Sequence, residues 1–152
     1  MNDAAIGEEC DLCNMTGTYD HNIDEKGRIN FPVKLREQLG ESFWIARGTS
    51  GKFLAVYSAA GWKDVMRQIQ NLKGPSGEKM RRWICAGAAE VTPDKQGRIL
   101  IPQALRNFAG LTRQVIVCGA GKKAEIWDYQ EYKHEEENFS PEESGMLDEL
   151  CL

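Results

Sequence analysis

The chain has 152 residues, a mass of 17.1 kDa and a net charge of -4 at pH 7, which suits one ordinary domain or two small repeats that share a core. Hydrophobic residues make up 41% and charged residues 28%, which argues against a wholly disordered chain, and no apolar run reaches the roughly 18 residues of a membrane helix. The first residues lack the basic and apolar segments of a signal peptide. Five cysteines, an odd number, suit a reducing cytoplasm better than a disulfide framework.

Charge is unevenly distributed along the chain. Residues 1–16 carry four acids and residues 134–152 carry seven, with no Lys or Arg in either segment. All 19 basic residues therefore lie in residues 17–133, against 12 acids, which gives the central part a net charge of +7. A basic body suits a polyanionic partner such as nucleic acid, although many basic domains bind none.

Short strands and short helices alternate along the predicted structure. In the first half we predict strands at 18–22, 28–31, 43–47 and 53–57, a helix opened by Pro32, and a helix at about 60–72. A Gly-Pro-Ser-Gly linker at 74–77 then leads to a short helix at 78–86. In the second half we predict strands at 89–92, 98–101, 114–118 and 124–127, a helix opened by Pro102, and a helix from about Gln130. Gly40 and Gly110 fall where a glycine commonly ends a helix.

A 13-residue segment occurs twice in the chain, 70 residues apart. Residues 24–36 and 94–106 are identical at seven of these 13 positions, and each reads Asp-x-x-Gly-Arg followed by Pro-x-x-x-Arg. The order of predicted elements is also the same in both halves. Because one half alone is smaller than a comfortable folding unit, we expect the halves to pack as a pseudo-dimer around one mostly β core.

We divide the chain accordingly into five segments. They are an acidic N-terminal extension (1–14), a first repeat (15–73), a linker with a short helix (74–83), a second repeat (84–137) and an acidic C-terminal tail (138–152). We expect both acidic segments to be poorly ordered and to lie away from any nucleic-acid site, because like charges repel.

The repeated Asp-x-x-Gly-Arg segments predict two tight turns. An aspartate can accept backbone N–H bonds from residues that follow it, and a glycine can supply the positive φ that closes such a turn. The arginine that follows the glycine has two interpretations. It could pair with a neighbouring carboxylate, which is the commoner role, or it could contact phosphate or base edges. A turn does not require the same arginine twice, so the repetition favours the second interpretation.

The two segments, from Tyr19 to Arg28 and from Ala88 to Pro102, resemble the paired signature motifs of the MraZ family. The resemblance covers residues 15 to about 137. It implies an α+β fold, mostly β with short helices, in which two tandem AbrB-like swapped-hairpin repeats form an intrachain pseudo-dimeric β-barrel. It also implies a bacterial transcriptional regulator of the division and cell wall gene cluster that assembles into a ring and binds repeated promoter boxes.

The resemblance implies a set of site residues as well. Arg28 and Arg98 would contact double-stranded DNA, helped by Lys26 and Lys95, and the loops would be shaped by four further residues, namely Asp24, Gly27, Asp94 and Gly97. Arg36 and Arg106 occupy motif positions too, where an ion pair from the helix to Asp24 or Asp94 is an equally good interpretation. The extension at 1–14 departs from the family pattern.

The remaining sequence motifs predict neither a metal site nor a phosphate-binding loop. Cys10-x-x-Cys13 lacks the second ligand pair of a zinc site, and the Gly-Lys pairs at 51–52 and 121–122 lack the spacing of a phosphate-binding loop. We therefore predict no metal, no cofactor and no enzymatic activity. Six scattered aromatic residues are expected to pack in the core or between subunits: Trp44, Tyr57, Trp62, Trp83, Trp127 and Tyr132.

Our main functional hypothesis is a sequence-specific DNA-binding regulator, most simply a repressor, in the cytoplasm and associated with the nucleoid. Its partners would be promoter DNA and further copies of itself, because a multimer of weak arginine loops gains affinity by avidity. Two alternatives stay open: a ring-forming scaffold whose arginine loops make subunit salt bridges, and an AbrB-like antitoxin whose C-terminal tail binds a toxin.

Overall fold

A computed structural model gives the architecture of the chain and describes residues 14–152. The first half contains strands β1 (Thr18–Asn22), β2 (Arg28–Asn30), β3 (Phe43–Arg47) and β4 (Leu54–Tyr57) with helices α2 (Val33–Leu39) and α3 (Ala59–Gln70). Helix α4 (Gly74–Ala86) leads to the second half. That half contains β5 (Ala89–Val91), β6 (Arg98–Leu100), α5 (Gln103–Ala109), β7 (Gln114–Gly119), β8 (Ala124–Asp128) and α6 (Tyr129–Asn138), followed by a 3-10 turn, η1 (Leu147–Glu149).

The two halves exchange their first strands. Strand β1 of the first half pairs antiparallel with β7 of the second, and β5 of the second half pairs antiparallel with β3 of the first. The six-stranded sheet therefore has the order β1-β7-β8-β4-β3-β5, which reads the same from either end once the halves are interchanged. This exchange confirms the predicted swapped-hairpin pseudo-dimer.

A pseudo-twofold axis relates the halves, and the strand register shows where it passes. Ile29 of β2 pairs with Ile99 of β6, and Ala55 of β4 pairs with Glu125 of β8. Both pairs join positions that are 70 residues apart, the spacing of the sequence repeat. The axis therefore runs through the small β2–β6 sheet and through the middle of the large sheet.

The strands do not close into a barrel, which corrects that part of the expected fold. The large sheet ends at β1 and at β5, and β2 and β6 form a separate two-stranded sheet. At three residues each, β2 and β6 are too short to bridge the two edges. They instead close over the main core, which includes the buried side chains of Ile29, Ile99, Phe43 and Ile45.

Local sequence accounts for the short helices. Pro32 and Pro102 occupy the N-cap positions of α2 and α5 with φ near -55°, so each helix begins one residue after its proline. Gly110 ends α5 in the left-handed region at φ 66°, and Gly40 ends α2 at φ 94°. Each helix thus lasts only seven residues, which places its single arginine in the last turn.

The predicted linker at 74–77 is wrong, because these residues form the first turn of α4. Gly74 has φ 75°, and Pro75 lies in the first turn, where its missing N–H leaves no bond unmade. The connection between α3 and α4 is therefore only residues 71–73. Arg81 of α4 caps α3 by donating to the carbonyls of Ile69 and Leu72 at 3.1 and 3.0 Å.

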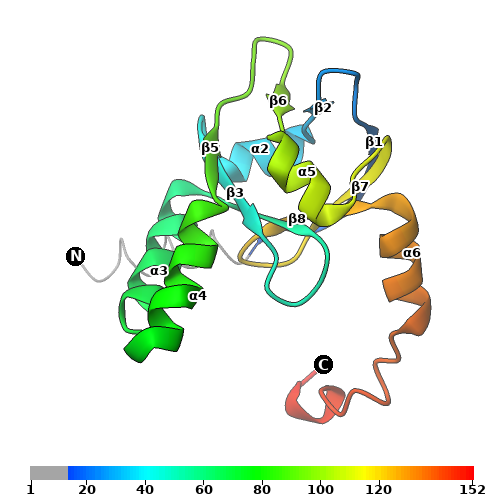
Figure 1. The fold of residues 1–152 in the computed structure, drawn as a ribbon. Coiled ribbons are helices and arrows are strands. Elements are labelled where there is room, and N and C mark those ends of the chain that lie inside the picture. The colour runs from blue at the N-terminus through cyan, green and yellow to red at the C-terminus, as the bar shows by residue number, and fades with distance from the viewer. Residues whose placement is uncertain (1–13) are drawn as a thin grey trace.

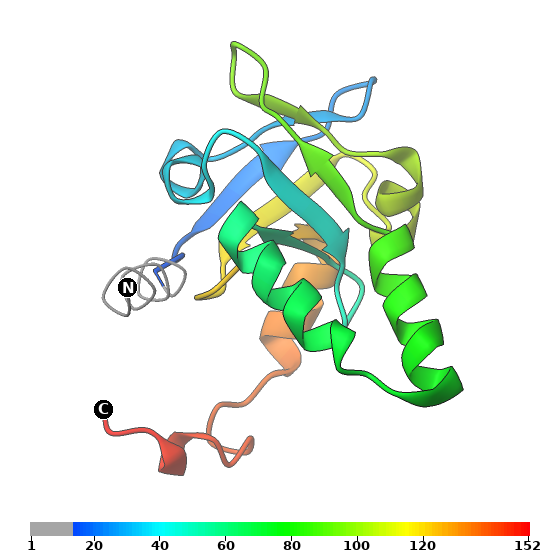
Figure 2. The ribbon, with the colours of Figure 1, turned by 90° about the vertical axis from the view of Figure 1, so that its left-hand side faces the viewer.

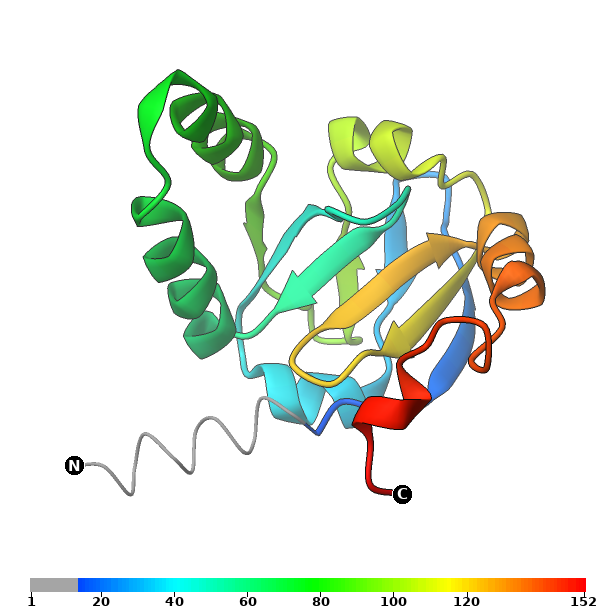
Figure 3. The same cartoon turned by 90° about the horizontal axis from the view of Figure 1, so that it is seen from below.

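The arrangement of the elements separates two ends of the molecule (Figure 1). The β1–β2 and β5–β6 loops project together at one end, and the C-terminal tail lies at the opposite end, as Figure 2 also shows. Seen from below in Figure 3, α3 and α4 lie to one side of the sheet and α6 to the other. The tail is thus remote from the loops, as predicted, whereas residues 1–13, with Cys10 and Cys13, lie outside the described residues.

Aromatic side chains pack within the fold, as predicted. Trp44 stacks on Trp62 with ring centroids 5.1 Å apart, and Phe53 stacks on Trp127 at 4.8 Å. Among the described residues, no helix combines the length and apolar character needed to cross a membrane.

Candidate functional site

The first Asp-x-x-Gly-Arg loop is organised around one carboxylate. Oδ1 of Asp24 accepts the backbone N–H groups of Lys26 and Arg28, both at 2.9 Å, and Oδ2 accepts Nε–H of Arg28 at 2.8 Å. The backbone N–H of Gly27 donates to the carbonyl of Asp24 at 3.0 Å, which closes the turn. The predicted Asx-turn is therefore present, and it holds the arginine as well as the backbone.

The second loop repeats this geometry. Oδ1 of Asp94 accepts the N–H groups of Gln96 and Arg98 at 2.9 Å each, and Oδ2 accepts Nε–H of Arg98 at 2.9 Å. Gly97 has φ 80° and Gly27 has φ 87°, in the region that favours glycine. Two loops of the same sequence pattern thus adopt one conformation in two different surroundings.

These bonds lower the pKa of both loop aspartates below the usual value. The main cause in each is the hydrogen bond from the backbone N–H of Arg28 or Arg98, reinforced by the guanidinium of the same residue. Asp24 and Asp94 are therefore ionised at neutral pH and hold the arginines in place.

The repetition favoured a role in which Arg28 and Arg98 contact DNA and not a neighbouring carboxylate, but each of them does have a carboxylate partner. The side chains are 30% and 31% exposed, and each gives its Nε–H to the aspartate four residues earlier. The terminal Nη groups, in contrast, make no hydrogen bond within residues 14–152. The ion pair therefore fixes the direction of each guanidinium and leaves its outer donors available.

Arg36 and Arg106 hold the loops from the opposite halves. The guanidinium of Arg106 lies so close to Gly27 that an added Cβ would be 2.6 Å from its Cζ, and Arg36 lies against Gly97 in the same way, at 2.9 Å. Each also donates Nε–H to a backbone carbonyl, Arg106 to Ile101 at 2.9 Å and Arg36 to Phe31 at 3.1 Å. The ion pair to Asp24 or Asp94, one of the two predicted roles, is not formed.

Backbone hydrogen bonds cross between the halves at the same point. The N–H of Ile101 donates to the carbonyl of Gly27 at 2.9 Å, and the N–H of Phe31 donates to the carbonyl of Gly97 at 3.0 Å. Each loop is therefore completed by the other half. The sequence spacing located both arginines but could not show this exchange.

Lys26 and Lys95 project from the loop tips and are exposed. They are not equivalent, since Lys26 precedes its glycine directly and Lys95 stands one position earlier in its loop. A hollow of about 650 Å³ lies beside the first loop and is lined by Lys26, Arg28 and also Arg113. Sequence reasoning missed Arg113 because it lies outside the repeated segment.

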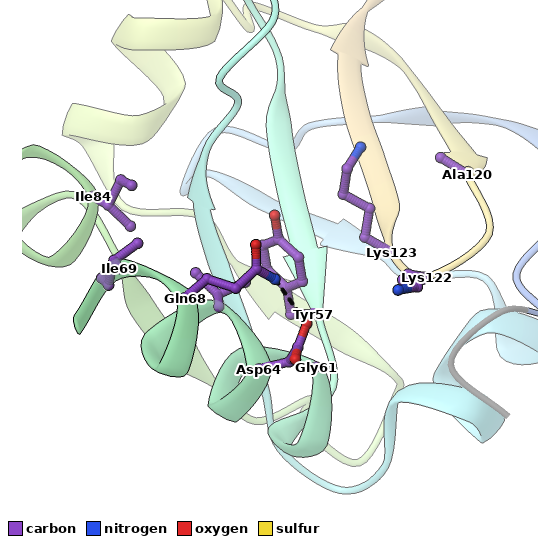
Figure 4. A pocket seen from close by; sticks show the side chains of 10 residues that line it. Tyr57, Gly61, Asp64, Gln68, Ile69, Ile84, Ala120, Lys122 and Lys123 are labelled. Carbon is purple, nitrogen blue, oxygen red and sulfur yellow. Dashed lines mark hydrogen bonds between the residues drawn. The ribbon is translucent and has the colours of Figure 1, made fainter. Parts of the chain in front are cut away.

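A further pocket, of about 440 Å³, lies between α3, α4 and the β7–β8 turn (Figure 4). Its carboxylate, Asp64, accepts hydrogen bonds from Gln68 and Arg67 at 2.9 Å each. Burial raises the pKa of Tyr57, which therefore stays protonated. Among residues 14–152, no group of three or more His, Cys, Asp and Glu side chains could hold a metal ion.

Comparison with known proteins also divides the chain into two repeats and identifies relatives that match most of its length. A family model described as "MraZ protein, putative antitoxin-like" matches residues 15–80 and again residues 84–149. A "Transcriptional regulator MraZ" of Acetivibrio thermocellus is 41% identical over 89% of this chain and 92% of its own length. Proteins of the same name from Treponema denticola and Leuconostoc citreum are 42% and 40% identical, over 83% and 87% of this chain and 92% and 96% of their own lengths.

The fold and the paired loops thus define a tandem swapped-hairpin protein with two arginine loops at one end. The chain belongs to the MraZ family. This family is one of transcriptional regulators by the name its relatives carry, and not one of enzymes.

Proposed function

We propose that the chain is a transcriptional regulator that binds double-stranded DNA sequence-specifically through its two Asp-x-x-Gly-Arg loops. Its targets would be repeated boxes in the promoter of the division and cell wall gene cluster, where bound protein would block transcription. Several chains would act together in a ring in the cytoplasm, on the nucleoid. The relatives named as transcriptional regulators support the general role.

One observation carries the DNA-binding part of the proposal. Arg28 and Arg98 are each clamped at Nε by an aspartate, while their outer Nη donors stay unpaired within residues 14–152. A guanidinium held in this way keeps the planar pair of donors that fits a guanine edge or a phosphate, and it loses little entropy on binding. Both groups belong to loops at the same end of the molecule (Figure 1), so one duplex could meet both.

The charge distribution also supports DNA binding at the end of the molecule that carries the two loops. The acidic C-terminal tail lies at the end away from the loops (Figure 2), where it does not repel a phosphate backbone. In the scaffold alternative, the loop arginines would form salt bridges with carboxylates of another subunit. Those arginines already have an aspartate within their own loop, which weakens that alternative.

The antitoxin alternative keeps one supporting observation. The tail exposes apolar side chains that could bind a protein partner, and the family description contains the word antitoxin. These side chains are Phe139, Met146, Leu147, Leu150 and Leu152. Removing the tail separates the two functions, because DNA binding through the loops does not require it.

Binding of the duplex upstream of the chain's own gene tests the proposal. Arg28→Ala and Arg98→Ala should each lower the affinity by about 1–3 kcal/mol for every base edge that the arginine no longer reads, while the subunit assembly stays intact in size-exclusion chromatography. Arg28→Lys should restore only part, because lysine keeps the charge and loses the planar fork. Arg82→Ala, which removes an exposed arginine of α4, serves as the control. Full-strength DNA binding by both alanine variants would refute the assignment, and so would dissociation into smaller species.

A further inference from the structure

The two loops differ in what lies beside them, although their own geometry is the same. A hollow of about 650 Å³ flanks the first loop, between it and the residues that lead into β7. A hollow of about 470 Å³ flanks the second loop at the place related by the pseudo-twofold axis, between it and the end of α2. The pair permits a direct comparison of two sites built on one plan.

The first hollow has a basic lining. Beside the clamped Arg28, it is lined by Lys26 from the loop and by Arg113 from the α5–β7 connection. Its acids are Asp24, whose oxygens already accept three N–H groups, and Glu25. Three cations thus face two acids, and because Arg28 pairs with Asp24, Lys26 and Arg113 remain against the single acid Glu25.

The second hollow has an acidic lining. It is lined by Glu37, Glu41 and Asp94, with Arg36 as the single cation among its lining residues. The place of Lys26 is taken in the second loop by Gln96. A phosphate that approached here would meet two carboxylates, Glu37 and Glu41, that make no ion pair within residues 14–152.

Arg113 is the residue that most distinguishes the two hollows. By strand register it corresponds to Glu41, because Val115 of β7 and Phe43 of β3 pair with the equivalent residues His21 and Val91. A carboxylate thus stands beside the second loop where the first has a guanidinium. The carbonyl of Arg113 accepts the N–H of Ile23 at 2.7 Å, which fixes its backbone beside the loop. Its side chain is exposed and forms no ion pair within the described residues.

We propose that Lys26 and Arg113 form a phosphate-binding site for the DNA backbone beside the clamped Arg28, and that the second loop has no equivalent site. These two cationic side chains around one hollow can neutralise a phosphodiester, whereas the carboxylates beside the second loop repel it. The first hollow thus offers a phosphate contact that the second hollow lacks. This inference rests on the proposed DNA-binding function and adds Arg113 as a positioning residue that carries no sequence information.

A salt titration of binding tests the role of Arg113. The probe is the duplex upstream of the chain's own gene, compared with a scrambled duplex of the same length and composition. Arg113→Ser removes the charge and keeps a small polar side chain, and it should weaken binding about eightfold at 0.1 M salt if each bound chain then neutralises one phosphate fewer. The slope of log K against log salt should fall by about 0.9 for that phosphate.

Two features distinguish binding to a phosphate from binding to a base. The loss of affinity should be equal for the two duplexes, and Arg113→Lys should restore most of it, because a point charge suffices for a phosphate. Arg82→Ser removes the same charge from α4 and should leave both affinity and slope unchanged.

The outcomes separate this inference from the function on which it rests. If Arg113→Ser binds both duplexes with the wild-type slope while Arg28→Ala weakens binding, the phosphate site is refuted and DNA binding stands. A loss confined to the specific duplex would also refute it, since it would make Arg113 a base-reading residue. If the wild-type chain binds neither duplex, both the proposed function and this inference fail.

Discussion

Replacing Gly27 by alanine perturbs the first loop at the point where the two halves meet. Gly27 has φ 87°, and a Cβ there would lie 2.6 Å from Cζ of Arg106. Gly110 also has a positive φ, 66°, in the left-handed region, but a Cβ there would meet only Nζ of Lys52, at 3.8 Å. Alanine costs about 1–3 kcal/mol of backbone strain at either position. The comparison of Gly27→Ala with Gly110→Ala therefore isolates the contact with Arg106.

The structure indicates the size of that contact. To make room for the methyl group, Arg106 must move and give up the hydrogen bond from its Nε–H to the carbonyl of Ile101, which is 2.9 Å long. A hydrogen bond of a charged group contributes about 1.5–3 kcal/mol, and partial exposure of the guanidinium reduces this to about 1–2 kcal/mol. For a chain of this length, Gly27→Ala should therefore melt about 2–8 °C below Gly110→Ala.

Thermal unfolding of the two variants at one protein concentration measures this difference. Arg106→Ala combined with each glycine variant completes the test, because the excess cost of Gly27→Ala should vanish once the guanidinium is gone. Equal melting temperatures for the two single variants would show that Arg106 does not press on the loop. An excess that persists in the Arg106→Ala background would refute the reasoning as well.

Two further predictions concern the body of the fold. Arg47, whose guanidinium lies 5.0 Å from the ring of Trp83 and donates to its carbonyl at 3.1 Å, fastens α4 to the sheet. Arg47→Ala should cost about 1–2 kcal/mol in urea unfolding, whereas the exposed Lys63→Ala should cost almost nothing, and equal costs would contradict this role. Burial raises the pKa of Cys118 to about 12, so iodoacetamide at pH 8 should label the exposed Cys151 at least about a hundred times faster, as peptide mass spectrometry would show. Comparable labelling rates would mean that the strand carrying Cys118 opens readily.

The strands were the most predictable part of the structure. The predicted strands at 18–22 and 43–47 have the observed bounds. The pairing of those strands was not readable, since alternation shows which face is buried and says nothing about the neighbour. Only the internal repeat and the family resemblance indicated the exchange.

The Asp-x-x-Gly-Arg loops were likewise predictable only in part. The sequence predicted the turn at Asp24 and Gly27 because these residue types have local conformational preferences. It left open what the arginines contact, because each contact depends on tertiary placement. Arg28 binds its own loop, and Arg106 binds the loop of the other half. Arg113 lay outside any motif, and only the folded structure brings it beside Lys26.

The exchange of arginines also bears on why one chain carries the motif twice. In a symmetric dimer of single hairpins, any change that improves one loop changes both. Two halves in one chain are free of this restriction, and here the two sites differ around the same clamp: Arg113 stands beside the first loop and Glu41 beside the second. The contacts between the halves must stay the same in both: Arg36 packs against Gly97, and Arg106 packs against Gly27. The repeated Pro-x-x-x-Arg segment is therefore explained by packing between halves, while the lining of each hollow is free to set how strongly each loop binds.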